Sequence, residues 1–234
     1  IYYVIFTKVL DNHIEGFAIY LMAGLLPFTA FSQGVGSAAG SITANAGLVR
    51  KVSFPRLVLP LSAVGFALVQ FLLQLGVLLT VVVVFAHNRI GPELLFMVPA
   101  LALLLLFTTA LGILVAALNV RYRDTSHFVE IAMLVWFWGN PILYAAGLVK
   151  HALGTSYWAY FLNPMATVVT TFQRAIYNQA YYTDATGRRV EALADPGDMF
   201  FVRNLLLGFA ISGLLLLLAQ RVFNRLQADF AEEL

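Results

Sequence analysis

The chain has no cysteine among its 234 residues, and only 11% of its residues are charged. The absence of thiols excludes disulfides, thiolate metal ligands and a cysteine nucleophile. Ordinary globular domains are about 25% charged, whereas 61% of this chain is hydrophobic. The composition therefore indicates an integral membrane protein, for which the bilayer is the solvent. A net charge of +2 without a Lys/Arg-rich stripe argues against nucleic acid as a partner.

Motifs for chemistry are also missing. There is no G-x-x-x-x-G-K-[ST] segment to cradle ATP phosphates, and the four histidines stand singly, without metal-ligand spacing. The densest ionisable cluster, residues 11–15, is interpreted as a solvated loop. A membrane enzyme would need paired carboxylates or a metal cluster. A secondary transporter coupled to an ion gradient would need an acidic group near the midplane of the membrane. Glu130 is instead expected at a membrane interface, because it follows Arg123 and Asp124. Both classes remain less favoured alternatives.

Long runs almost without charge predict an all-α, polytopic protein with one transmembrane domain. A helix needs roughly 20 apolar residues to cross the hydrocarbon core. The predicted spans, about six, are 1–10 (the remnant of a span whose start is missing), 17–44, 57–86, 94–118, 128–149 and 203–220. Pro27 and Pro141 are expected to kink or break their helices. The small-residue spacing at Gly36–Gly40 is interpreted as a site of packing within the chain rather than a dimer seam.

Positive charge orients these spans. If they alternate, one side receives Arg50, Lys51, Arg56, Arg121, Arg123, Arg221 and Arg225. The other side receives Lys8, Arg89 and Lys150 in its short flanks. Because short loops rich in Lys and Arg stay in the cytoplasm, the first side is predicted to be cytoplasmic, with the 221–234 tail. Residues 157–203 carry four further arginines, which we discount because long external segments follow the rule poorly.

The region after residue 150 has helical punctuation but too few apolar residues to span. Asn163 is a predicted N-cap and Pro164 the first helical residue. The following residues to 177 have an apolar face, which predicts a re-entrant or interfacial helix on the outer side. Residues 178–200 are polar and turn-rich, as in an external loop. Trp136 and Trp138 near the Pro141 break could stack on sugar rings or form an interfacial aromatic belt, and both interpretations stay open.

The stretch "NAGLVRKVSFPRLVLP" between two spans gathers charge. Residues 46–54 predict a short amphipathic helix on the cytoplasmic surface, ended by Pro55. A helix held between two spans acts as a lever, because a soluble partner pressing on it would move both. From the residues alone, this partner contact and a plain charged loop are equally favoured.

Five segments in order resemble a known family: "AGLLPFTAFSQGV", "NAGLVRKVSFPRLVLPLSAV", "LNVRYRDTSHF", "GNPILY" and "LNPMATVVTTFQRAIYN". The chain resembles the membrane (permease) subunit of type-2 ABC exporters of lipid-linked polysaccharide, such as O-antigen, teichoic acid, capsule or mycobacterial galactan. The resemblance implies a homodimer with the path between the copies. It also implies a separate cytoplasmic ATPase that binds ATP and Mg²⁺, no cofactor in this chain, and location in the bacterial cytoplasmic membrane.

The resemblance also assigns candidate residues. The implied substrate is a polysaccharide on a polyprenyl diphosphate, with export of a small molecule or drug as the alternative. The family's ATPase-coupling helix corresponds to Asn45, Leu48, Val49, Arg50, Lys51, Val52, Ser53 and Phe54. The cytoplasmic entrance corresponds to Arg121, Arg123 and Asp124, whose arginines would attract the diphosphate. The outer gate helices correspond to about 150–161 and 163–177, and the outer gate and aromatic path to Trp136, Trp138, Tyr157, Trp158, Asn163, Pro164 and Arg174.

Overall fold

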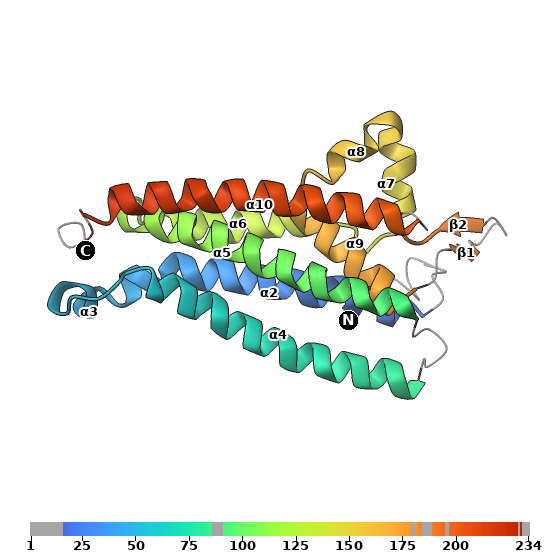
Figure 1. Cartoon of the computed structure of the whole chain (residues 1–234), viewed down its shortest axis with the longest axis horizontal. Helices are drawn as coiled ribbons and strands as arrows, with labels where there is room; N and C mark the ends of the chain where they lie inside the picture. The colour runs from blue at the N-terminus through green and yellow to red at the C-terminus, as the bar shows by residue number, and fades with distance from the viewer. Residues whose placement is uncertain are drawn as a thin grey trace.

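The computed structural model describes residues 16–85, 91–178, 181–183, 189–194, 197–228 and 230. Four long helices run side by side in a bundle (Figure 1): α2 (Phe17–Ala44), α4 (Val58–Phe85), α5 (Met97–Arg121) and α10 (Asp198–Leu226). Each is long and apolar enough to cross a membrane, α5 together with the 3₁₀ turn η3 (Pro92–Phe96) before it. The all-helical, polytopic fold predicted from composition is confirmed. The predicted span 1–10 and the cluster 11–15 lie outside the described residues.

Shorter elements join and cap these helices. They are α3 (Ala46–Lys51), α6 (Thr125–Trp138), α7 (Ala146–Leu153), η4 (Gly154–Ser156), α8 (Tyr157–Tyr160), α9 (Pro164–Ile176), β1 (Tyr181–Thr183) and β2 (Arg189–Glu191). The two strands form an antiparallel hairpin with Tyr182 opposite Val190. This hairpin lies within the segment that sequence predicts as an external loop.

Helix α5 lies at the centre, in contact with α2, α4, α9 and α10. Small residues let it approach its neighbours: a Cβ added at Gly34 would lie 2.7 Å from Cγ2 of Thr108, and one at Gly208 would lie 2.7 Å from Cδ2 of Leu103. Close approach through small residues is how membrane helices gain packing energy without a hydrophobic driving force. The predicted packing role of Gly36 and Gly40 is wrong, because a Cβ at either position meets nothing within 4 Å.

The predicted span 128–149 is also wrong as a single helix. Helix α6 ends at Trp138, and α7 begins only at Ala146. Pro141 has no N–H to donate and its ring disfavours helical geometry at the preceding Asn140, so the helix ends before it. The predicted break at Pro141 is therefore confirmed, whereas α2 continues through Pro27.

The bundle has two chemically different ends (Figure 1). At the end we call the α3 end lie α3, the turn between α5 and α6, and the carboxyl end of α10. At the opposite end, the hairpin end, lie η3, the carboxyl end of α9, the start of α10 and the β-hairpin. The seven cations that sequence predicts on the cytoplasmic side all belong to segments of the α3 end.

Candidate functional site

The helix α3 is shorter than predicted. It begins after Asn45, whose side chain donates to the carbonyl of Ser41 at 2.8 Å, and it ends at Lys51. Val52 already has extended backbone angles, φ −127° and ψ 131°. The predicted helix 46–54 is therefore too long at its carboxyl end, because the residue before Pro55 is driven to extended geometry and the last turn cannot form.

The faces of α3 divide cleanly between the bundle and the outside. Val49 is 5% exposed and belongs to an apolar cluster with Ile42 of α2, Val120 of α5 and Phe223 near the end of α10. Leu48 and Val52 are exposed large apolar residues. The exposed polar residues beside them are Arg50, Lys51 and Ser53, whereas Phe54 packs against the cluster. Through Val49, α3 thus packs into an apolar cluster to which α2, α5 and α10 also contribute. Its outward surface carries both apolar and cationic side chains.

Arg56 ties this region to the end of the chain. Its Nη1 donates to the backbone carbonyl of Gln227, and its guanidinium lies over the Phe230 ring, 5.9 Å from the centroid. Sequence analysis treats Arg56 only as a marker of topology. Its contacts were missed because their partners lie about 171 residues away and carry no local signal.

A groove runs between α2 and α6. The hollow has a volume of about 340 Å³, and its polar lining comes from Thr29, Ser32 and Gln33 of α2 and from Glu130 of α6. Glu130 is exposed and lies 3.9 Å from Nδ1 of His127. It is five residues into α6, roughly 7.5 Å from the amino end of the helix at 1.5 Å per residue, and its position at a membrane interface stays a prediction. Phe28 and Phe137 supply apolar walls.

Two further hollows lie at the α3 end. One, of about 330 Å³, is lined by Gly40 and Thr43 of α2 and by Asn119, Arg123 and Ser126. The other, of about 460 Å³, lies on the same turn and includes Arg123 and Asp124 in its lining. The structure thus brings two of the three predicted entrance residues to hollows, while the Arg121 guanidinium lies over the Tyr122 ring at 5.9 Å.

Buried Asn119 holds the turn between α5 and α6 in place. Its Nδ2 donates to the carbonyl of Ala39 at 2.9 Å, and its Oδ1 accepts from the backbone N–H of Ser126 at 3.0 Å. One side chain therefore links α2, α5 and the first turn of α6, which sets where the arginine-bearing turn lies. Both hydrogen-bonding groups of the amide are used, as expected for a buried polar residue.

Asn163 organises the opposite end of α6. Its Oδ1 accepts from the backbone N–H of Met165 at 3.1 Å, which confirms the predicted N-cap of α9, with Pro164 at the first helical position. The same oxygen accepts from the Trp136 indole at 3.2 Å, and Nδ2 donates to Oδ1 of Asn140, also at 3.2 Å. The Trp136 ring packs edge-on against Phe31, 5.4 Å between centroids. The indole N–H and ring of Trp136 are thus engaged inside the bundle, whereas Trp138 is 58% exposed.

The broken segment after α6 is satisfied by buried side chains. The Tyr20 hydroxyl donates to the carbonyls of Pro141 at 3.1 Å and Tyr144 at 2.8 Å, and Gln173 donates to the Pro141 carbonyl at 2.7 Å. Non-helical backbone at membrane depth is tolerated only where protein groups or water satisfy it. Sequence analysis missed Tyr20 and Gln173, because only the fold brings α2 and α9 to this carbonyl.

Helix α9 is buried on nearly all sides, in contact with α2, α5 and α10. Its threonines do not form a wet face: Thr170 donates to the Ala166 carbonyl at 2.8 Å and Thr171 to that of Thr167 at 2.6 Å. Such bonds to the preceding turn let hydroxyls enter an apolar environment. Burial against three of the long helices is what the re-entrant geometry requires, and the choice between the re-entrant and the interfacial geometry stays a prediction.

The elements α7, η4 and α8 project from the bundle (Figure 1). Tyr157 donates to the carbonyl of Ala194 at 3.1 Å and stacks on Phe200, whereas Trp158 is largely exposed. The Tyr160 hydroxyl donates to the carbonyl of Gly139 at 2.9 Å. Burial, with a contribution from the nearby Tyr144, raises the pKa of Tyr160, so it stays a neutral donor.

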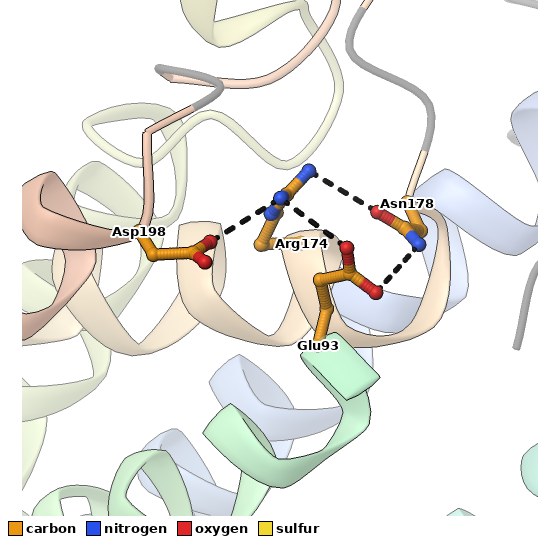
Figure 2. Close-up of polar contacts among 4 residues, drawn as sticks. All are labelled: Glu93, Arg174, Asn178 and Asp198. Atoms are coloured by element: carbon orange, nitrogen blue, oxygen red, sulfur yellow. Dashed lines mark hydrogen bonds and ion pairs between the residues drawn. The ribbon is translucent and has the colours of Figure 1, made fainter. Parts of the chain in front are cut away.

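Arg174, predicted at the outer gate, forms the centre of a polar ring at the hairpin end (Figure 2). Its Nη2 pairs with Glu93 of η3 at 3.5 Å and with Asp198, the first residue of α10, at 3.3 Å. Its Nη1 donates to Oδ1 of Asn178 at 3.1 Å, and Asn178 donates in turn to Oε2 of Glu93 at 3.0 Å. The ring joins three elements that are far apart in sequence.

Long apolar helices, a segment broken at Pro141 and a groove with a mixed polar and apolar lining define a polytopic membrane protein. The family model described as ABC-2 type transporter matches residues 1–177, about three quarters of the chain. The chain therefore belongs to the ABC-2 type transporter family of membrane proteins. Membership makes it a transport subunit rather than an enzyme and implies pairing with a separate ATPase subunit.

Similar proteins carry a common name. The chain is 32% identical over all of its 234 residues to the O-antigen export system permease protein RfbA of Myxococcus xanthus, 82% of which is covered. Two proteins of the same name from Klebsiella pneumoniae are 30% and 29% identical over 179 and 181 residues, in each case 76% of this chain and 68% of the relative.

Proposed function

We propose that this chain is the membrane subunit of an ATP-driven exporter that moves a polyprenyl-diphosphate-linked polysaccharide across the bacterial cytoplasmic membrane for envelope assembly. The observation that carries the proposal is the groove between α2 and α6, which combines apolar walls with four polar side chains, in a chain similar along its whole length to an O-antigen export permease. The groove offers hydroxyl and amide groups that suit sugar hydroxyls.

The groove is open along one side. Farther along α2 toward the α3 end lie Gly36 and Gly40, where an added Cβ would meet no atom within 4 Å. Polar groups facing lipid are costly, so a covering surface is expected. A second copy of the chain would cover the groove and complete a path between two subunits. Phe28 and Phe137 would present apolar ring faces to the sugars.

Coupling to the ATPase would occur at α3. Its exposed Leu48 and Val52 offer apolar contact, and Arg50 and Lys51 offer charge. Val49 links α3 to α2, α5 and α10, so a force on α3 reaches three spans. ATP and Mg²⁺ would be bound by the partner, whose closure can shift this subunit only by its different affinity for the two states.

The diphosphate would bind first at the α3 end, where Arg123 lines both hollows and Arg121 lies nearby. Charge-assisted bonds to phosphate favour arginine. We expect Arg123→Gln to weaken binding of the lipid-linked substrate by about tenfold, the loss of one charge-assisted hydrogen bond, and Arg121→Gln to weaken it less. Binding of the lipid-linked substrate to purified protein measures this. Unchanged binding and export in both variants would contradict the entrance assignment.

The whole proposal is tested by isolating the chain from native membranes and reconstituting it with the ATPase that accompanies it. We expect lipid-linked polysaccharide to stimulate ATP hydrolysis and to appear on the far side of the vesicle. Stimulation by a small apolar drug and not by the polysaccharide would show a small-molecule exporter instead. Purification without an ATPase would contradict the proposal.

A further inference from the structure

The polar contacts among Arg174, Glu93, Asn178 and Asp198, here called the Arg174 ring, have the features of a contact that is not broken during transport (Figure 2). The side chains of Arg174 and Glu93 are only 11% and 21% exposed, whereas that of Asp198 is 64% exposed. Removing one partner of a buried ion pair leaves an uncompensated charge and is strongly destabilising. A movement that separated α9 from η3 would therefore carry a high energetic cost.

Backbone geometry supports the same conclusion. Asn178 has a positive φ of 50°, which is uncommon outside glycine, and in this conformation its amide bonds both Arg174 and Glu93. Gly91 passes so close to the ring that an added Cβ would collide with the Glu93 carboxylate. The local backbone is thus shaped around the closed ring.

The amino end of α9 is held as firmly as its carboxyl end. There Asn163 bonds Trp136 and Asn140, and between the two ends the helix is buried among three spans. By contrast, residues 151–156 of the projecting α7 and η4 are exposed. The projecting part is held to the remainder by hydrogen bonds from Tyr157 to the Ala194 carbonyl, from Tyr160 to the Gly139 carbonyl and from the Ala146 N–H to the Ala192 carbonyl at 3.3 Å, and by the stacking of Tyr157 on Phe200.

We infer that the outer gate has a fixed part and a moving part: α9 stays joined to η3 and α10 throughout transport, and α7, η4 and α8 move to open the path. Arg174 is then a positioning residue, which keeps the re-entrant helix in register while the projecting elements swing. This inference rests on the proposed export function, since a gate has meaning only for a path.

The chain has no native cysteine, so any introduced pair is its only source of crosslinks. In one variant, Glu93→Cys and Asn178→Cys replace the ring contact by a covalent one. In a matched variant, Tyr157→Cys and Ala194→Cys join the projecting part to the segment before α10. Each protein is assembled with its ATPase and assayed for export before and after bridging by a short bis-maleimide, with the bridged fraction measured by mass spectrometry.

We expect export with residues 93 and 178 bridged to lie within about twofold of the native complex, because the covalent link replaces the ring contacts that the two substitutions remove. We expect the bridge between 157 and 194 to lower export at least tenfold relative to its own unbridged variant. Loss of export on bridging 93 to 178, or full export with 157 bridged to 194, would overturn the inference. Absence of polysaccharide export by the unmodified complex would instead overturn the proposed function, so the two failures are distinguishable.

A second measurement separates positioning from folding. Arg174→Gln should lower export by about tenfold, the loss of a charge-assisted hydrogen bond. Bridging 93 to 178 in that background should restore export, because the covalent joint replaces the ring. Restoration would not follow if Arg174 contacted the substrate itself, and export that stays low would overturn the positioning role. Thermal unfolding of both proteins before and after bridging shows how much of the change in export follows general stability.

Discussion

The two ends of the bundle both use an arginine to hold distant segments together, but they treat charge differently. At the hairpin end, Arg174 is surrounded by Glu93, Asp198 and Asn178, so its charge is neutralised inside the chain. At the α3 end, Arg56 bonds a backbone carbonyl and an aromatic ring, and Arg50 and Lys51 remain exposed beside it. One end thus neutralises its arginine within the chain, whereas the other leaves two cations exposed, as the ATPase contact proposed at α3 requires.

The largest expected effect tests the exposed charge at the α3 end. Reversing it with Arg50→Glu and Lys51→Glu should lower export by more than tenfold while ATP hydrolysis continues, because buried Val49 still holds α3 on the bundle and only the outward surface changes. Export and ATPase activity of the reconstituted complex measure this. Arg221→Glu with Arg225→Glu, two exposed cations at the same end, is the matched control. Equal loss in both pairs would indicate a general charge effect, and full coupling in the first pair would leave its two residues as topology markers only.

An intermediate effect tests neutralisation at the hairpin end. Glu93→Gln should lower the free energy of unfolding by about 2 kcal/mol, since it removes a partly buried partner of Arg174. Asp198→Asn should cost under about 1 kcal/mol, because exposed ion pairs contribute little. Thermal unfolding of the isolated subunit in detergent compares the stability of the Glu93→Gln and Asp198→Asn variants. If the Asp198 variant were the less stable, the ring would not be the neutralising unit that its geometry indicates.

The smallest expected effect concerns Arg56. Arg56→Gln should loosen the contact between the start of α4 and the chain near Gln227 and Phe230, at a cost of about 1 kcal/mol for the hydrogen bond and the ring contact. Faster amide hydrogen exchange at the carboxyl end of α10 is the readout, with Arg56→Lys as a variant that keeps the charge. Unchanged exchange in Arg56→Gln would show that the apolar cluster around Phe223 suffices to hold this end.

Much of this architecture can be predicted from the sequence, because the features that produce it act on residues close by in the chain. Long apolar runs predict the four long helices, Asn163 with Pro164 predicts the start of α9, and Pro141 predicts the end of α6. These signals work because a missing N–H, a capping side chain or a run of apolar residues acts within a turn or two of its own position.

The errors have a common cause in longer-range contacts. Residues 163–177 predict a helix with one apolar face, but α9 is buried on nearly all sides, and the hydroxyls of Thr170 and Thr171 bond to carbonyls of their own helix. Gly36 and Gly40 suggested a packing face, but α2 turns Gly34 toward α5 instead. A helical repeat shows which residues share a face, but not which neighbour that face meets.

The sequence by itself determined that this protein belongs in a membrane, where its four long apolar helices run, and which segments gather its positive charge. Only the tertiary structure decided that α9 is buried, that Tyr20 and Gln173 satisfy the broken segment, and that Glu93 and Asp198 neutralise Arg174 while Arg50 and Lys51 stay exposed. The physical reason is the range of the interactions. The membrane preference and the ends of helices depend on residues close in the sequence, whereas burial, hydrogen bonds and ion pairs between helices depend on contacts that only the folded chain creates.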